Sequence, residues 1–310
     1  MRIPARLAYL ATFVGVCGHA SSEFFAKLSG VQGPETSVWR YVLGSAALVV
    51  WALLTPGSRD LLAPLRTHGL RFVVLSLVGV SGAYLAFHWS LDFASVVQVA
   101  TMTTTIPIFV GLANLIVNGQ RIGTVKLVTG AMAVIGVVLL LTDGYLADLA
   151  SAGGATLFGV ALALACAVLA AGYSVLVKPV MAEHGALLVT TSSLVIGAIG
   201  LWVAVGVFWG VWVNPVELGE KPATAAWALV VLALWNTAIT QVLWLGGLSA
   251  APDITRASYL FFLKPVIAAV LALVFLSVAI TPLQVAAILV VTGSVLVELA
   301  WPRLAARRAA

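Results

Sequence analysis

The fold follows from a stretch of sequence that occurs twice. Residues 91–107 read LDFASVVQVATMTTTIP, and residues 248–265 read LSAAPDITRASYLFFLKP. With one single-residue gap, the two stretches align from their first leucine to their final proline. The similarity extends over residues 79–141 and 236–297, at an offset of about 157 residues, close to half the chain. A repeat of this length indicates that the chain consists of two related structural units.

The composition is that of a protein surrounded by lipid. Of the 310 residues, 62% are hydrophobic and 9% are charged, and the mean hydropathy is +1.12. Soluble domains carry about 25% charged residues, so this chain is not built for water. Apolar stretches of about 20 residues, the length that spans a hydrocarbon core, recur throughout. We predict an all-α integral membrane protein with ten transmembrane helices, at residues 7–28, 35–54, 70–91, 94–117, 125–142, 155–178, 187–213, 223–247, 253–275 and 283–301.

The predicted helices divide into two repeats of five, residues 1–149 and residues 150–310. Because five is an odd number, the second repeat crosses the membrane in the opposite direction, and the repeat is inverted. An apolar chain built from inverted repeats is typical of a secondary transporter, in which the substrate site lies at the midplane between the repeats. The partners expected of such a chain are a small-molecule substrate and the lipid bilayer.

Basic residues are distributed unequally between the two faces of the membrane. When the connections are assigned alternately to two faces, one face collects twelve Lys and Arg residues and the other only Lys27, Arg40 and Lys221. Cytoplasmic loops carry the excess of basic residues. We therefore predict that both termini are cytoplasmic and that the chain lies in the inner (plasma) membrane. This bias explains the net charge of +5 without a nucleic-acid partner.

Lys264 lies near the centre of the ninth predicted helix, directly before Pro265. A lysine at this depth costs about 2.5–3.5 kcal/mol on insertion scales, so it requires a partner or a water-filled cavity. One interpretation is a cation that binds an anionic substrate group, such as a carboxylate. The alternative is a structural ion pair, with Glu23 as the candidate partner. In both cases Lys264 faces the interior of the protein.

Pro107 and Pro265 occupy matching positions in the fourth and ninth predicted helices. Proline removes a backbone N–H donor and kinks a helix. Because the two kinks fall at symmetric places in the repeats, we expect them to act as paired hinges. Static kinks that help packing are the alternative.

A polar stripe follows the first predicted helix. His19, Glu23 and Lys27 are spaced four residues apart and therefore share one face. Glu23 followed by Lys27 is the favourable order for an ion pair within a helix, and this pair is one interpretation. The other is proton coupling through Glu23 or His19, since ionisable groups within membranes often act as relays.

Further polar and aromatic side chains lie on the third, fourth, eighth and ninth predicted helices. We expect them to form a substrate pocket, with hydrogen bonding between helices as the alternative for each polar residue. The candidate substrate-binding residues, in addition to Lys264, are Tyr84, His88, Gln98, Thr101, Trp235, Asn236, Gln241 and Tyr259.

The segment 91–136 contains Asp92-Phe93-Ala94-Ser95, Ile106-Pro107-Ile108-Phe109 and Asn118-Gly119-Gln120-Arg121. With these motifs the chain resembles the EamA family of the drug/metabolite transporter superfamily, over essentially its whole length and as two tandem units. The resemblance implies ten helices, both termini inside, and a central cavity lined mainly by the first, third, fourth, sixth, eighth and ninth helices. It also implies the export of small metabolites, amino acids among them.

Two details refine this resemblance. In the Asn118-Gly119-Gln120 turn and the Trp235-Asn236 pair, the chain resembles members of the branch that exports aromatic amino acids. The family usually has a Glu where this chain has Gln120, so any role of that carboxylate is not carried over.

We therefore predict a secondary transporter that exports small amphipathic metabolites, first among them aromatic or other neutral amino acids. A transporter of a sugar, a nucleotide-like solute or a drug-like cation is the alternative. An intramembrane enzyme is not expected, because the sequence contains no HExxH, no G-x-S-x-G and no paired intramembrane aspartates. No cofactor or metal is expected. We expect a monomer, with a dimer through small-residue helix faces as the alternative.

Overall fold

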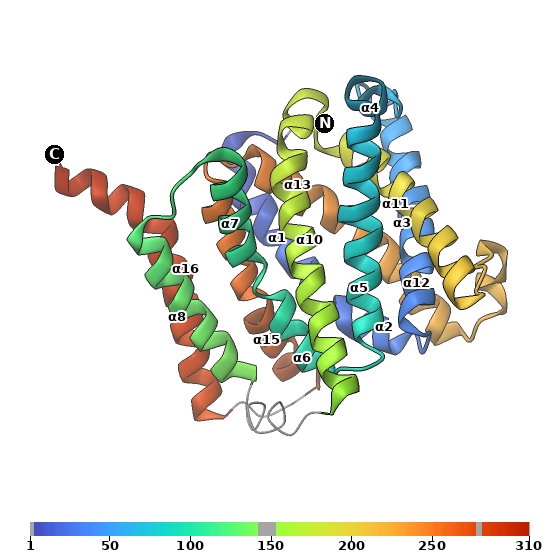
Figure 1. The fold of residues 1–310 in the computed structure, drawn as a ribbon. Coiled ribbons are helices and arrows are strands. Elements are labelled where there is room, and N and C mark those ends of the chain that lie inside the picture. The colour runs from blue at the N-terminus through green and yellow to red at the C-terminus, as the bar shows by residue number, and fades with distance from the viewer. Residues whose placement is uncertain (1–2, 142–152, 277–280, 310) are drawn as a thin grey trace.

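The computed structural model describes residues 3–141, 153–276 and 281–309, and those residues form helices and no strand. Figure 1 shows the helices packed into one bundle, with the N- and C-termini at the same end. The predicted all-α fold is therefore confirmed. The predicted boundary between the halves, at residues 149 and 150, lies outside the described residues.

Each predicted transmembrane segment of the first half is helical in the structure. The elements are η1 (Ala5–Leu7), α1 (Ala8–Ala20), α2 (Ser22–Leu28), α3 (Gly33–Leu54), α4 (Ala63–Ser76), η2 (Leu77–Gly82), α5 (Ala83–Ser90), α6 (Val96–Thr103), α7 (Ile106–Asn118) and α8 (Thr124–Leu141).

The second half repeats this order. Its elements are α10 (Gly154–His184), α11 (Ala186–Trp209), η3 (Pro215–Glu220), α12 (Ala223–Ala233), η4 (Leu234–Ile239), α13 (Thr240–Ala250), α14 (Ile254–Ser258), η5 (Tyr259–Leu263), α15 (Lys264–Leu276) and α16 (Pro282–Ala309).

Seven helices within the described ranges are long and apolar enough to cross a membrane, and α8 supplies a shorter apolar helix. The first and ninth predicted helices are not among the seven, and each is divided into shorter elements. The first breaks at Ser21, between α1 and α2, and the ninth passes from α14 through the 3₁₀ turn η5 into α15. Such interruptions are typical of transporter helices at the substrate site.

The packing of the helices follows the sequence repeat. α3 lies along its counterpart α11, and α8 lies along its counterpart α16. α1 packs on α13, and the equivalent pair, α10 with η2 and α5, packs in the same way. Both equivalent contacts are close at glycines: a Cβ atom on Gly15 would lie 2.8 Å from the Trp244 backbone nitrogen, and one on Gly79 would lie 2.5 Å from the Tyr173 side chain. The two halves therefore form one interlocked core.

A second regularity is the position of the π-helical turns. η2 begins at Leu77 and η4 begins at Leu234, so they occupy equivalent places in the third and eighth helices of the repeat. A π-helical turn inserts one residue into an α-helix and often marks a functional site. These turns lie in the centre of long helices, next to the cavity described below.

The prolines predicted to kink the fourth and ninth helices lie in a different setting. α6 ends at Thr103, and Pro107 is the second residue of α7; Pro265 is likewise the second residue of α15. In the first turn of a helix proline has no intrahelical hydrogen bond to lose. Each proline therefore follows a local change in the helix: the turn at Thr104 and Thr105 precedes α7, and the 3₁₀ turn η5 precedes α15. Hinge motion at these breaks stays a prediction.

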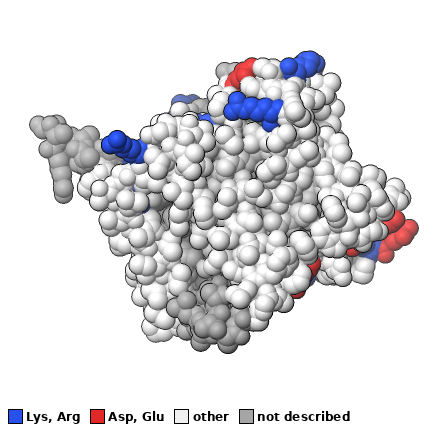
Figure 2. Space-filling view, in the orientation of Figure 1, with Lys and Arg blue, Asp and Glu red and all other residues white. Residues whose placement is uncertain are grey.

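Charged side chains mark the ends of the bundle. Figure 2 shows Lys and Arg side chains gathered at the end that carries both termini. Small residues predicted to allow helix association face inward: Ala163, Ala167 and Ala171 of α10 are fully buried within the chain. That face is used for packing within the chain.

Candidate functional site

A cavity lies in the interior of the bundle, between the two halves. Its polar lining consists of His19, Ser22, Arg40, Tyr84, Thr103 and Lys264. Aromatic rings of Phe87, Trp244 and Phe261 form much of the remaining wall. The lining comes from all the helices that the family resemblance assigned to the cavity, and from α3 as well. The space holds about three water molecules, so the structure has a contracted cavity.

Lys264 points into this cavity and forms an ion pair with the Glu23 carboxylate. Both side chains are 5% exposed. The Lys264 ammonium also donates a hydrogen bond to Thr103 Oγ1 at 3.2 Å and lies 5.9 Å and 5.6 Å from the ring centres of Phe87 and Phe261. Of the two interpretations of Lys264, the ion pair is present, and it lies at the wall of the cavity.

The Glu23–Lys27 pair, the alternative interpretation of the polar stripe, does not form. Glu23 pairs with Lys264 instead, and the Lys27 ammonium donates to the Leu91 carbonyl oxygen at 2.6 Å. Because Glu23 is buried and Lys27 lies near the end of α2, the two side chains point to different surroundings. His19, on the other side of the break, lines the cavity between Trp244 and Phe261. Its buried Nε2 has no hydrogen-bond partner among the described residues.

Arg40 is the second cation of the cavity, and its side chain is 1% exposed. Its Nε donates to Thr237 Oγ1 at 2.7 Å, and its Nη1 donates to Ser22 Oγ at 2.6 Å. Its Nη2 donates to the Asn236 carbonyl oxygen at 2.6 Å. Thr237 and Asn236 belong to the π-helical turn η4, which therefore holds the guanidinium in place.

All these partners of Arg40 are neutral, and among the described residues it forms no ion pair with a carboxylate. A buried charge is costly unless it is both paired and hydrogen-bonded, and Arg40 has the hydrogen bonds without the counter-ion. With Lys264 compensated by Glu23, the Lys, Arg and Glu side chains at the cavity leave one excess positive charge. The cavity is therefore suited to one negatively charged group.

His88 lies behind Arg40 and is fully buried. Its Nε2 is 3.3 Å from Arg40 Nη1, and its Nδ1 is 2.9 Å from both the Tyr84 carbonyl oxygen and Ser37 Oγ. A guanidinium can only donate, so Nε2 accepts, and Nδ1 carries the proton of a neutral imidazole. His88 therefore orients Arg40 and does not line the cavity itself.

Tyr84 and Gln241 connect the third and eighth helices at the cavity wall. The Gln241 side-chain amide donates a hydrogen bond to the Tyr84 hydroxyl. The Tyr84 ring packs against Tyr41 with ring centres 4.7 Å apart, and the Arg40 guanidinium lies 5.8 Å from the Tyr84 ring centre. Asn236 supports the same region, since its side-chain amide donates to the Gly18 carbonyl oxygen at 2.5 Å.

The other predicted binding residues lie outside the cavity lining. The Gln98 side chain closes a capping box with Ser95 at the start of α6, and the Tyr259 hydroxyl donates to the Lys126 carbonyl oxygen. Thr101 is buried on α6, and Trp235 is partly buried in η4; neither belongs to the lining. The lining residues that the sequence prediction did not select are Ser22, Arg40, Phe87, Thr103, Ile106, Cys166, Ala170, Trp244 and Phe261.

Comparisons with known proteins agree with this architecture. A model of the EamA-like transporter family matches residues 6–142 and 157–299, one match for each half of the chain. No curated protein matches the chain. A solved structure entitled "Crystal structure of protein" superposes with a TM-score of 0.77 at 19% identity, covering 96% of this chain and 98% of that chain, and so shares the fold. The two family matches account for most of the sequence, and the chain belongs to the EamA-like transporter family, a family of membrane transporters of small solutes.

Proposed function

We propose that this transporter exports small amphipathic metabolites that carry a carboxylate, with aromatic and other neutral amino acids as the first candidates. The observation that carries the proposal is the excess positive charge of the cavity, which Arg40 provides. Its guanidinium presents donors in a planar fork that suits a carboxylate. The direction of transport and the amino-acid class rest on the resemblance described above.

In the proposed cycle, the substrate enters an expanded form of the cavity from the cytoplasm. Its carboxylate binds between Arg40 and Lys264, and its apolar part packs against Trp244, Phe87 and Phe261. The contracted cavity of the structure corresponds to a state between the two open ones. Rocking of the inverted repeats at the breaks before Pro107 and Pro265 then opens the cavity to the outside.

The membrane arrangement in this proposal keeps all ten segments as transmembrane helices, with residues 1–149 and 150–310 as the two repeats. Both termini lie in the cytoplasm, the membrane is the inner (plasma) membrane, and the chain works as a monomer. Glu23 and His19 are the proposed proton-binding groups. Protonation of Glu23 would release Lys264 and add a second positive charge to the cavity, which would couple a proton to the binding of an anion.

The alternative solute classes fit the cavity less well. A drug-like cation would meet an excess positive charge, and a neutral sugar would leave Arg40 uncompensated. A nucleotide-like solute has the right sign of charge but needs more space than an amino acid. A neutral amino acid is small and brings a carboxylate to Arg40, while its ammonium group leaves the whole molecule without net charge.

The test is counterflow in liposomes that contain the purified protein. Labelled tryptophan, phenylalanine and threonine are compared with a sugar and a cationic dye, using wild type, Arg40→Gln and the control Arg121→Gln, an exposed arginine. We expect saturable exchange of at least one amino acid, lost in Arg40→Gln and kept in Arg121→Gln. Uptake of the sugar or the dye without any amino-acid exchange would overturn the proposed substrate class.

A further inference from the structure

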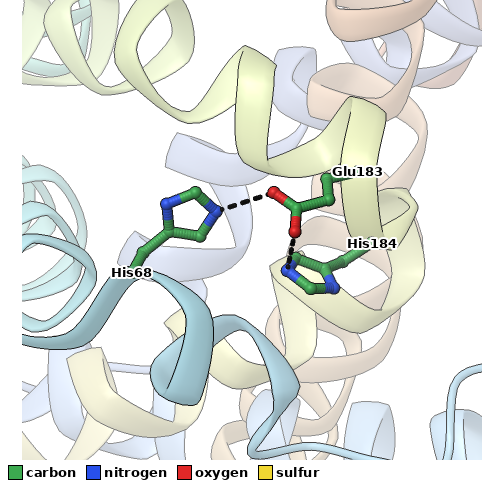
Figure 3. Close-up of side chains that lie close together, drawn as sticks. All are labelled: His68, Glu183 and His184. Carbon is green, nitrogen blue, oxygen red and sulfur yellow. Dashed lines mark hydrogen bonds and ion pairs between the residues drawn. The ribbon is translucent and has the colours of Figure 1, made fainter.

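A cluster of two histidines and one glutamate lies outside the cavity, where the end of α10 meets α4. His68 belongs to α4, and Glu183 and His184 are the last residues of α10. Figure 3 shows both rings turning a nitrogen toward the Glu183 carboxylate. His68 Nε2 is 3.0 Å from Glu183 Oε2, and His184 Nε2 is 3.3 Å from Glu183 Oε1. The cluster is at the end of the bundle that carries both termini (Figure 1).

The backbone fixes this arrangement from both sides. Gly69, directly after His68, has a φ of 53°, and Gly185, directly after His184, has a φ of 88°. Residues with a side chain rarely adopt these conformations, so glycine allows a sharp change of direction at each point. Both histidines are consequently held at places where a helix is interrupted or ends, and they face each other with ring centres 5.9 Å apart.

The geometry and the donor types fit a transition-metal ion. One ligand atom from each of the three residues lies within 4.8 Å of the other two. Zinc binds His nitrogen and carboxylate oxygen at about 2.0–2.2 Å in a tetrahedron, which places neighbouring ligand atoms about 3.4 Å apart. Each imidazole nitrogen lies close to this distance from a different oxygen of the Glu183 carboxylate, His68 from Oε2 and His184 from Oε1. The His68, Glu183 and His184 side chains are 22%, 47% and 14% exposed, so the cluster lies near the surface, with His184 Nε2 itself buried.

A second observation separates a metal site from a simple hydrogen-bonded cluster. His184 Nε2 is buried and makes no hydrogen bond, although it faces the carboxylate. A buried polar atom whose contact with a carboxylate lacks hydrogen-bond geometry is unfavourable. A metal ion between the three side chains would use this lone pair directly.

We propose that His68, Glu183 and His184 bind one zinc ion, with water in the fourth position, and that the ion ties the end of α10 to α4. The proposal is independent of the transported substrate, because none of the three residues lines the cavity.

The test uses purified full-length protein without a polyhistidine tag, treated with a chelator and titrated with zinc against a chromophoric competitor. The variants are His68→Gln and His184→Gln, which keep a polar side chain at partly exposed positions. Glu217→Gln, an exposed carboxylate in η3, is the control. Thermal unfolding of each protein, with and without zinc, shows whether the variants are folded.

We expect wild type to bind one zinc ion per chain. The affinity for zinc should fall by about tenfold or more in each histidine variant and stay unchanged in Glu217→Gln. Zinc should raise the melting temperature of wild type and of Glu217→Gln, in which the site is intact, and not that of the two histidine variants. Absence of saturable binding, or equal affinity in wild type and both histidine variants, would overturn the proposal.

Discussion

Removal of one member of the Glu23–Lys264 ion pair should cost more stability than removal of both. Both side chains are 5% exposed, so either single substitution leaves a buried charge without its partner. Such a loss costs about 3–5 kcal/mol, whereas neutral replacement of both partners of a buried pair is often tolerated. We therefore expect Lys264→Met to destabilise by about 3–5 kcal/mol and the Glu23→Gln/Lys264→Met double variant to lie within about 1 kcal/mol of wild type.

The structure also predicts that the two single variants differ. In Glu23→Gln, Lys264 keeps its hydrogen bond to Thr103 and its contacts with the rings of Phe87 and Phe261. Contacts between a cation and an aromatic ring contribute about 0.5–2 kcal/mol, so Glu23→Gln should cost about 2–3 kcal/mol.

The assay is a double-mutant cycle, measured by reversible unfolding in mixed detergent micelles. The matched control is the surface pair of Arg66 and Asp60, whose side chains are 61% and 56% exposed. Single costs of about 3–5 and about 2–3 kcal/mol, with a double variant close to wild type, give a coupling of about 5–8 kcal/mol for the buried pair, against at most about 1 kcal/mol for the surface pair. Additive costs of the two single substitutions at Glu23 and Lys264 would refute the reasoning.

Three further predictions concern the cavity and its supports. Arg40→Gln should weaken binding of an anionic substrate by about 10- to 150-fold, the equivalent of one charge-assisted hydrogen bond, as measured by the substrate concentration at half-maximal counterflow; unchanged affinity would exclude Arg40 from recognition. Gln98→Ala should cost about 0.5–2 kcal/mol of stability through the lost capping box with Ser95, and a large change in substrate affinity instead would contradict its capping role. Pro107→Ala combined with Pro265→Ala should slow exchange while leaving the substrate dissociation constant within about twofold; a variant that keeps the wild-type exchange rate would show that these breaks are not hinges.

Much of the fold could be predicted because it depends on repeated and long-range patterns. These patterns extend over long parts of the sequence: they are the offset between the repeats, the length of the apolar segments and the matching positions of the two prolines. Lys264 stood out for the same reason, since a lysine in the middle of an apolar helix is conspicuous. The π-helical turns could not be predicted, because one inserted residue barely changes the apolar pattern of a buried helix.

The site was harder to predict because it depends on depth within the membrane. We expected Arg40 at the membrane face, but α3 begins at Gly33, so Arg40 is about 10 Å along the helix and reaches the interior. Gln98 was selected for its polarity, yet Ser95 and Gln98 have the spacing of a capping box, a signal that the sequence does contain. The spacing of His68 from Glu183 and His184 gives no local signal, because only the packing of α4 on α10 brings them together.

The central claim is that the cavity recognises a negative charge through Arg40. The most direct measurement is equilibrium binding of two matched indole compounds to the purified protein by calorimetry. One is 3-indolepropionate, which has a carboxylate and no amine; the other is tryptamine, which has an amine and no carboxylate. We predict that wild type binds 3-indolepropionate and not tryptamine, and that Arg40→Gln loses this binding. Tighter binding of tryptamine, or binding of 3-indolepropionate that is unaffected by Arg40→Gln, would contradict the claim.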